Sequence, residues 1–502
     1  MMGWQEDSYA SVHRVQAVRA RFARIAVVIA AVSGAFGASA QEPDQLPEVA
    51  VLRVLDPDGT LVGQQEEAYE SWAEGSTAMR RRFISVTVDG HEKVDVFSRV
   101  MITSEDGGAH IAFEGEFSAA DSGVVYLGEI TGQTAQITRT RVTGERTVAE
   151  DSYSQTIPEG LPIADPEALY PQLSGRILAF DPASGRFAEY EALSVPQPAG
   201  SRYPGSLRII LRDNYPVDLR VIERGEDGVL VSATQPQPGS PFRYVPVEFE
   251  DLDPEAEIGG RVGHPMIESP HVISAGAKRR HIRYSVTLAQ ALAERLPQTA
   301  QQAVTLIDNG AQIDICGTCG PGLPTDAESL ARWTQPTPWL QSDYDPIVRR
   351  AQSIARRGSS DRRTLELLGE AVRARMLRVD FSGHYSARAA WERRSGDCTE
   401  DAVLLAALAR AAGIPTRVVS GLAYSRDRYH GARNAFIPHA WVVAYVDGAW
   451  VSYDMTLDEG FGAGHIALTI GDGEASQMAG ANMIAGMLEW QGLSEVRPRP
   501  SK

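Results

Sequence analysis

One cysteine of this chain stands where a helix is expected to begin. In the segment SGDCTEDAVLLAALARAAGIPTR, Asp397 can act as an N-cap, and Glu400 follows three positions later, as in a capping box. The apolar residues after it form one helical face, and Gly413 ends the helix. Cys398 is then the first helical residue, where free backbone N–H groups and the helix dipole favour a thiolate. The spacing predicts an activated cysteine, with a buried inert cysteine as the alternative.

A hairpin further along the chain brings a histidine close to a carboxylate. In the segment IPHAWVVAYVDGAWVSYDMT, Asp447-Gly448 predicts a two-residue turn. Pairing the strands around this turn sets Trp441 opposite Asp454, so that His439 is a diagonal neighbour of Asp454 on the same face. Diagonal neighbours lie about 7–8 Å apart, which side chains can span. The sequence therefore predicts a His439–Asp454 pair.

Cys398, His439 and Asp454 are residue types that suit nucleophilic catalysis. The imidazole can take the thiol proton, and the carboxylate can fix the orientation and tautomer of the imidazole. The backbone N–H of Cys398 can help to bind an oxyanion. Trp391 and Tyr385 are candidates for the second oxyanion donor because they are near in sequence.

These segments also resemble a known family. The blocks SGDCTEDAVLLAALARAAGIPTRVVSGLAY, PHAWVVAYVDGAWVSYDMT and GHIAL resemble the transglutaminase-like family of exported bacterial proteins in the order G-D-C-x-E, G-I-P-x-R, H-A-W and W-x-x-x-D-x-T. The resemblance covers Ser395 to Leu468 closely and Cys316 to Met376 loosely. It implies a papain-like α+β core with Cys398, His439 and Asp454 as the triad. Asp401 departs from the pattern, because relatives more often carry an aromatic residue or histidine there.

The resemblance does not fix the reaction. We expect a hydrolase of peptides or related amides that forms a thioester acyl-enzyme. A protein-glutamine acyltransferase on the same triad and a non-enzymatic binding or assembly protein are the alternatives. No D-x-D-x-D-G calcium loop occurs, and we expect no metal and no cofactor.

A loop from Leu422 to Pro438 is expected to border the cleft. Its candidate substrate-rim residues are Tyr424, Arg426, Tyr429 and Phe436. The arginine could recognise a carboxylate on a substrate. The alternative is an ordinary solvated loop.

The other two cysteines form a C-x-x-C motif, DICGTCGPG, followed by glycine and proline. We expect a structural disulfide between Cys316 and Cys319, as is common in exported proteins. A zinc site completed by distant histidines and a redox-active pair are the alternatives. In either case Cys398 remains without a cysteine partner.

The first 40 residues have the pattern of a signal peptide. Arginines precede the apolar run IAVVIAAVSGAF, and Ala38-Ser39-Ala40 forms a cleavage site. We therefore expect a periplasmic or secreted protein, with an uncleaved anchor as the alternative. No later segment contains 18 consecutive apolar residues, so we expect no stable membrane span after cleavage.

The whole chain is expected to be an α+β protein of several domains. In residues 41–290, apolar and polar residues alternate with period two and turn signals are frequent, which predicts an antiparallel β-rich region. This region could be a sandwich, a partial barrel or a large curved sheet, and it could consist of two subdomains. Helical periodicity after Thr287 predicts a core at residues 291–485, followed by a flexible tail at 486–502. The formal net charge of -17 argues against nucleic-acid binding, which leaves an amide substrate and a protein partner of the β-rich region.

Overall fold

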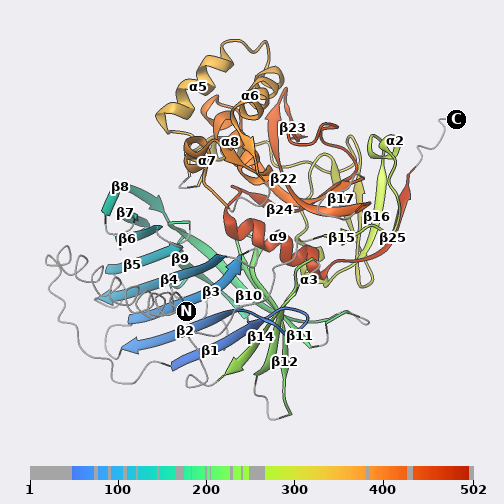
Figure 1. The fold of residues 1–502 in the computed structure, drawn as a ribbon. Coiled ribbons are helices and arrows are strands. Elements are labelled where there is room, and N and C mark those ends of the chain that lie inside the picture. Colours follow the sequence, from blue (N-terminus) through green and yellow to red (C-terminus); the bar gives the residue numbers. More distant parts are fainter. Residues whose placement is uncertain are drawn as a thin grey trace, which may run out of the picture. The chain divides into compact units, whose positions relative to one another are not determined.

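The computed structural model has two regions, an antiparallel β-rich region and a C-terminal α+β domain (Figure 1). The expected signal peptide lies outside the described residues. The structure describes residues 48–72, 77–88, 92–105, 110–119, 122–143, 146–163, 174–182, 184–197, 201–203, 205–226, 230–238, 241–247, 266–337, 339–379, 384–426 and 433–496.

The β-rich region is one hydrogen-bonded sheet of 14 strands. Its strands are β1 (Glu48–Leu55), β2 (Leu61–Trp72), β3 (Thr77–Val88), β4 (Glu92–Glu105), β5 (His110–Ala119), β6 (Ser122–Thr131), β7 (Thr134–Thr143), β8 (Arg146–Thr156), β9 (Ser174–Asp181), β10 (Arg186–Pro196), β11 (Ser206–Arg212), β12 (Tyr215–Arg224), β13 (Leu230–Gln235) and β14 (Phe242–Val247). Two meanders, β1–β8 and β9–β14, join where β1 pairs with β14. The antiparallel prediction is confirmed. The pairing of β1 with β14 joins the two meanders into one continuous sheet.

The two ends of this sheet pack against each other. Phe113 on β5 lies 4.7 Å from Phe180 on β9, measured between ring centroids. On the last strand of the first meander, Gln155 exchanges two hydrogen bonds with the backbone of Phe187, at 2.7 and 2.8 Å. The sheet therefore curves until its ends meet, as in the partial barrel that was one of the three forms the sequence allowed.

The C-terminal domain contains two further antiparallel sheets and the longer helices. The five-stranded sheet has the order β15-β22-β21-β24 with β23 paired to β22, and the four-stranded sheet has the order β17-β18-β16-β25. The elements are β15 (Ile267–Glu268), α2 (Ala275–Lys278), β16 (Ile282–Thr287), α3 (Gln290–Ala293), β17 (Gln302–Ile307), β18 (Gly310–Ile315), α4 (Ala327–Arg332), α5 (Asp345–Ala355), α6 (Asp361–Arg375), β19 (Leu377–Arg378), α7 (Ala387–Arg393), β20 (Ser395–Gly396), α8 (Cys398–Ala411), β21 (Thr416–Ser425), β22 (Ala435–Val446), β23 (Ala449–Tyr453), β24 (His465–Gly471), α9 (Ala475–Met487) and β25 (Glu489–Glu495).

Helix α8 lies at the centre of this domain. It packs on β22 and β21, and α5, α6 and α7 surround its other sides. Twelve consecutive residues of α8, from Thr399 to Arg410, are buried. A helix that is packed on all sides is held rigidly, so the position of a side chain on its first turn is fixed.

Three sequence-based expectations about this domain were wrong. Helical periodicity was expected from Leu288 to Val304, but only α3 is helical there, and β17 begins at Gln302 because the chain pairs with β18 from that residue. The domain begins before residue 291, because β16 is a strand of its four-stranded sheet. The expected tail at 486–502 contains the end of α9 and β25, whose pairing with β16 orders it.

A buried ion-pair cluster links the large sheet to the C-terminal domain. Arg212, at the end of β11, has a side chain only 1% exposed and pairs with Asp181 and Glu474. Arg186 also pairs with Glu474, at 3.1 Å. Among the described residues, no helix combines the length and the apolar character needed to cross a membrane.

Candidate active site

Cys398 begins α8 in the geometry that the capping box predicted. Asp397 accepts a hydrogen bond from the backbone N of Thr399 at 2.8 Å, and Glu400 accepts one from the backbone N of Asp397 at 3.0 Å. Gly396 is required here, because a Cβ on it would lie 2.5 Å from Cβ of Glu400. Cys398 is a free cysteine and is partly exposed.

His439 lies between Cys398 and Asp454. Its Nε2 is 2.9 Å from Oδ2 of Asp454, and its side chain also forms a hydrogen bond with Cys398. The hairpin supplies this geometry: Val446 pairs with Ala449 as predicted, and the ladder ends just before Asp454. The structure thus brings together the three side chains that the sequence singled out, on α8, on β22 and directly after β23.

The charges of these groups favour an ion pair. Burial by itself lowers the pKa of His439, but the Asp454 carboxylate and Cys398 outweigh it and raise the pKa to about 10. Burial raises the pKa of Asp454, yet His439 and His465 outweigh it and hold the pKa well below its usual range. His439 is therefore protonated at neutral pH and Asp454 is ionised.

His465 is a member of the site that sequence reasoning missed. It begins β24, and its Nε2 lies 3.0 Å from the same Oδ2 of Asp454. Burial lowers the pKa of His465, and its hydrogen bond to Asp454 offsets this only in part, so His465 is neutral. The sequence feature that could have pointed to His465 is its place in the GHIAL block. However, only the pairing of β24 with β21 brings His465 to Asp454.

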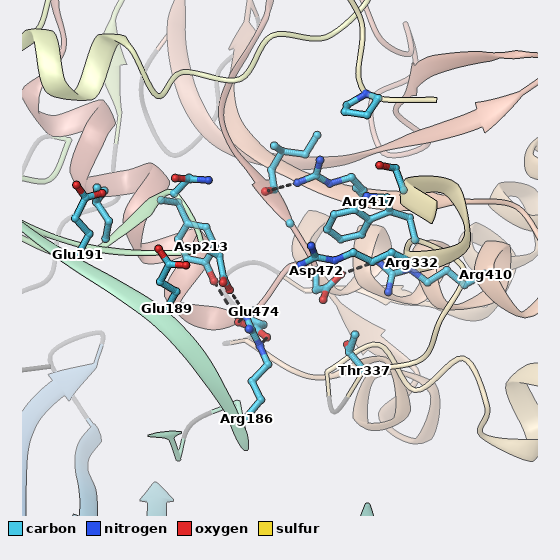
Figure 2. A pocket seen from close by; sticks show the side chains of 18 of the residues that line it. Arg186, Glu189, Glu191, Asp213, Arg332, Thr337, Arg410, Arg417, Asp472 and Glu474 are labelled. Atoms are coloured by element: carbon cyan, nitrogen blue, oxygen red, sulfur yellow. Dashed lines mark hydrogen bonds and ion pairs between the residues drawn. The ribbon is translucent and has the colours of Figure 1, made fainter. Parts of the chain in front are cut away.

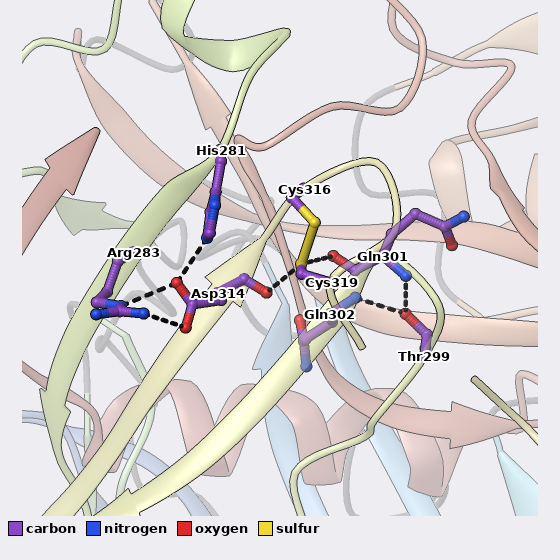
Figure 3. Close-up of a disulfide and its surroundings, with 8 residues drawn as sticks. All are labelled: His281, Arg283, Thr299, Gln301, Gln302, Asp314, Cys316 and Cys319. Atoms are coloured by element: carbon purple, nitrogen blue, oxygen red, sulfur yellow. Dashed lines mark hydrogen bonds and ion pairs between the residues drawn. A yellow bond between two sulfur atoms is a disulfide. The ribbon is translucent and has the colours of Figure 1, made fainter. Parts of the chain in front are cut away.

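The loop around the disulfide braces the strands that carry the site. Cys316 and Cys319 form the expected disulfide directly after β18 (Figure 3). Beside it, Gln301 Oε1 accepts hydrogen bonds from both the backbone N and the hydroxyl of Ser452, at 3.2 Å each. Gln302 exchanges two hydrogen bonds with the backbone of Ala467, at 2.8 and 2.9 Å. Both contacts lie two residues from a site residue, so this loop helps to fix the separation of Asp454 and His465.

Asp401, one turn along α8 from the cysteine, has a buried carboxyl group with few hydrogen-bond partners. The residue is 1% exposed, its Oδ1 has no hydrogen-bond partner, and Arg378 Nε lies 3.8 Å from Oδ2. Burial raises its pKa to about 6, Arg378 opposes this rise, and Asp397 and Asp454 add to it. The residue at which this chain departs from the family pattern is therefore buried and does not face solvent.

Of the expected substrate-rim residues, Tyr424 and Arg426 line one cavity together, whereas Phe436 lies inside the protein. Phe436 is fully buried, and its ring centroid lies 5.5 Å from that of Tyr424 and 4.8 Å from that of Trp490. The hydroxyl of Tyr424, also buried, donates to Asn434 at 3.0 Å. Arg426 is exposed and lines a cavity of about 590 Å³ that also reaches His465. Tyr429 lies outside the described residues.

The two candidate oxyanion donors differ in their surroundings. Tyr385 lies close to the start of α8, because its backbone N donates to Glu400 at 3.0 Å. Trp391 is stacked by Arg375, whose guanidinium lies 3.5 Å from the ring centroid, and it lines a cavity with Leu408 in the C-terminal half of α8. This packing gives no support to Trp391 as a donor near Cys398.

The two histidines and Asp454 are also residue types that bind metals. Their ligand atoms all lie within 4.8 Å of one another. However, both Nε2 atoms are already within hydrogen-bond distance of Asp454 Oδ2. Two N–H donors on one carboxylate account for the cluster, so its geometry calls for no cation.

Comparison with known proteins identifies the site's family. Residues 349–455 match the transglutaminase-like superfamily, and this match spans α5 to the carboxylate of the site. The C-terminal domain contains a transglutaminase-like core. The match includes α8, the helix that Cys398 begins and that packs on the five-stranded sheet.

The chain is also similar to three solved structures. A "Putative Cysteine Protease from Cytophaga hutchinsonii" is 16% identical, with 43% of this chain and 83% of that chain covered and a TM-score of 0.28. A β-barrel-like protein of unknown function from Brucella abortus is 12% identical, with 41% and 98% covered and a TM-score of 0.27. A "Putative Protease from Parabacteroides distasonis" is 10% identical, with 66% and 63% covered and a TM-score of 0.18. These scores are too low to bear on function, and a comparison with curated proteins finds no match.

Proposed function

We propose that this protein is a cysteine-dependent hydrolase of peptide or related amide bonds, with Cys398 as the nucleophile, His439 as the acid and base, and Asp454 as the orienting carboxylate. The observation that carries the proposal is the position of His439. Its Nε2 forms a hydrogen bond of 2.9 Å with Asp454, and its side chain also forms a hydrogen bond with Cys398. Because one ring nitrogen is held by the carboxylate, the other is left to exchange a proton with sulfur.

The proposed reaction has two steps. The Cys398 thiolate attacks the amide carbonyl, a C–S bond forms, the C–N bond breaks, and the imidazolium of His439 gives its proton to the departing amine. Water then attacks the thioester, His439 takes a proton from it, and a carboxylic acid leaves as the C–S bond breaks. Backbone N–H groups in the first turn of α8 have no intrahelical partner, so the N–H of Cys398 is available to the oxyanion.

Exposure of the nucleophile favours hydrolysis over acyl transfer. Cys398 is partly exposed, whereas Asp454 and His439 behind it are buried. An acyl group on an exposed sulfur is open to water, and transfer to an amine needs a site that keeps water away. The proposed location is an exported, oxidising compartment, which the N-terminal sequence pattern and the Cys316–Cys319 disulfide support.

The test uses an unfolded protein such as casein as substrate. New amino termini are measured for the native protein and for Cys398→Ala, with and without putrescine as a competing amine. A hydrolase releases amino termini in both conditions and incorporates little putrescine, and Cys398→Ala is inactive. Dominant incorporation of putrescine would replace the hydrolase by an acyltransferase, and equal turnover by Cys398→Ala would remove the enzyme assignment from this site.

A further inference from the structure

A second cluster of charged side chains lies at the opposite end of α8 from Cys398. Arg410 is twelve residues after Cys398 on this helix, which corresponds to about 18 Å. It lines a cavity of about 530 Å³ together with Arg332, Trp333 and Arg417 (Figure 2). A cavity of this size can hold a small organic molecule.

Three guanidinium groups surround one indole in this cavity. The carbon atoms at the centres of the Arg417, Arg332 and Arg410 guanidiniums lie 4.0, 4.9 and 5.6 Å from the ring centroid of Trp333. Stacking on an aromatic face holds a guanidinium in one plane and leaves its edge available for hydrogen bonds.

Among the described residues, Arg410 is the one of these three arginines that pairs with a carboxylate. Asp472 pairs with Arg410 at 2.6 Å, and two backbone carbonyls accept the remaining bonds of this fully buried side chain. Arg417 donates to the neutral carbonyl of Ile470 at 3.1 Å, while its Nε is buried without a partner. In the part of the chain that the structure describes, neither Arg332 nor Arg417 has a carboxylate within ion-pair distance.

The acidic side of the same cavity is already neutralised. Figure 2 shows Glu189, Glu191 and Asp213 away from the arginine cluster. Glu189 pairs with Arg176, and Glu191 and Asp213 have arginine partners at 3.4 and 2.5 Å. The charge left without a partner in the cavity is therefore positive and lies beside Trp333.

We propose that the cavity beside Trp333 binds the carboxylate or phosphate group of a small ligand, held by Arg332 and Arg417. Planar guanidiniums bind both groups through paired N–H donors, and such charge-assisted bonds are the strong ones in proteins. Burial and the positive neighbours Arg332 and Arg410 lower the pKa of Arg417 to about 10, with Asp472 opposing them. A bound anion would relieve that repulsion. The inference is independent of the proposed reaction at Cys398.

Calorimetry at constant ionic strength tests this site with two probes, inorganic phosphate and glutarate. We expect at least one of them to bind, and we expect Arg332→Gln and Arg417→Gln each to weaken its binding at least tenfold. Preference for one probe identifies the anionic group. Cys398→Ala should bind as the native protein does.

Arg363→Gln is the matched control, since Arg363 lies on α6 and pairs with Glu366 at the surface. It should leave binding unchanged. Arg332 ends a short helix and is exposed, so its variant should fold even if the Arg417 variant does not. Absence of binding of both probes at about 10 mM, or equal binding by Arg332→Gln and the native protein, would overturn the proposal.

Discussion

His465 donates a hydrogen bond of 3.0 Å to Asp454 through Nε2, from a strand that begins eleven residues further along the chain. The oxygen it reaches is the one that also binds His439. Asp454 Oδ1 is held separately by the backbone N of Thr456 at 2.7 Å. The carboxylate is thus fixed on both oxygens, and His465 acts as a positioning residue for the proposed triad.

Replacing His465 should lower turnover without removing it. We expect His465→Phe to reduce kcat/KM about tenfold, because one donor to a charged acceptor is lost while the other donors remain. His465→Gln can keep a donor and should retain more activity. Steady-state kinetics at equal protein stability measures this, and equal losses for the two variants would show that His465 only fills space.

Replacing His439 should lower kcat more than replacing Asp454. His439→Ala removes the group that exchanges protons with sulfur, and we expect a loss of about 10⁴-fold or more in kcat. Asp454→Asn keeps an oxygen that can accept from His439, so its loss should be about tenfold smaller. Single-turnover kinetics of both variants checks the order, and the reverse order would contradict the roles assigned here.

Asp401 should make stability depend on pH. Its pKa in the folded protein is about 6, above the ordinary value, so the folded state holds one more proton than the unfolded state between about pH 4 and 6. The free energy of unfolding therefore falls as pH rises through this window. Asp401→Asn should be more stable than the native protein by about 3 kcal/mol at pH 8 and little changed at pH 4. Urea unfolding at both pH values measures the difference, and a gain that is the same at both would be evidence against it.

The loop beside the disulfide should support the site as well as the fold. Gln301→Ala leaves the buried backbone N of Ser452 without its acceptor, which should destabilise the protein by about 1–3 kcal/mol. Because Ser452 is close to Asp454 in β23, turnover should also fall. Gln290→Ala, at an exposed position of α3, is the matched control and should change neither quantity measurably. If both glutamine variants behave alike, the loop has no such role.

Local signals were sufficient to predict that Cys398 begins a helix and that His439 lies beside Asp454. Asp397 and Glu400 marked the first turn of α8, and the turn at Asp447-Gly448 set the register that brings His439 to Asp454. Both features depend on residues close together in sequence, where capping and turn rules are strong.

Features that depend on distant pairing were not predictable in the same way. His465 reaches Asp454 only because β24 pairs with β21. Phe436 is buried because Tyr284 of β16 and Trp490 of β25 pack against it. The cluster of Arg332 and Arg417 around Trp333 likewise joins α4 to β21. No short-range pattern specifies such contacts, so a single sequence does not reveal them.

The most direct test of the proposed site is the rate at which iodoacetamide alkylates Cys398 between pH 4 and 9, in the native protein and in His439→Ala. Cys316 and Cys319 are joined in a disulfide, so without reductant the reaction reports on Cys398 alone. Since the raised pKa of His439 keeps its imidazolium beside sulfur, we predict fast alkylation that persists well below pH 7 and is lost in the variant. Slow alkylation that rises only near pH 8.5 or above, as for an ordinary free thiol, and that is the same in both proteins, would contradict a His439-activated nucleophile.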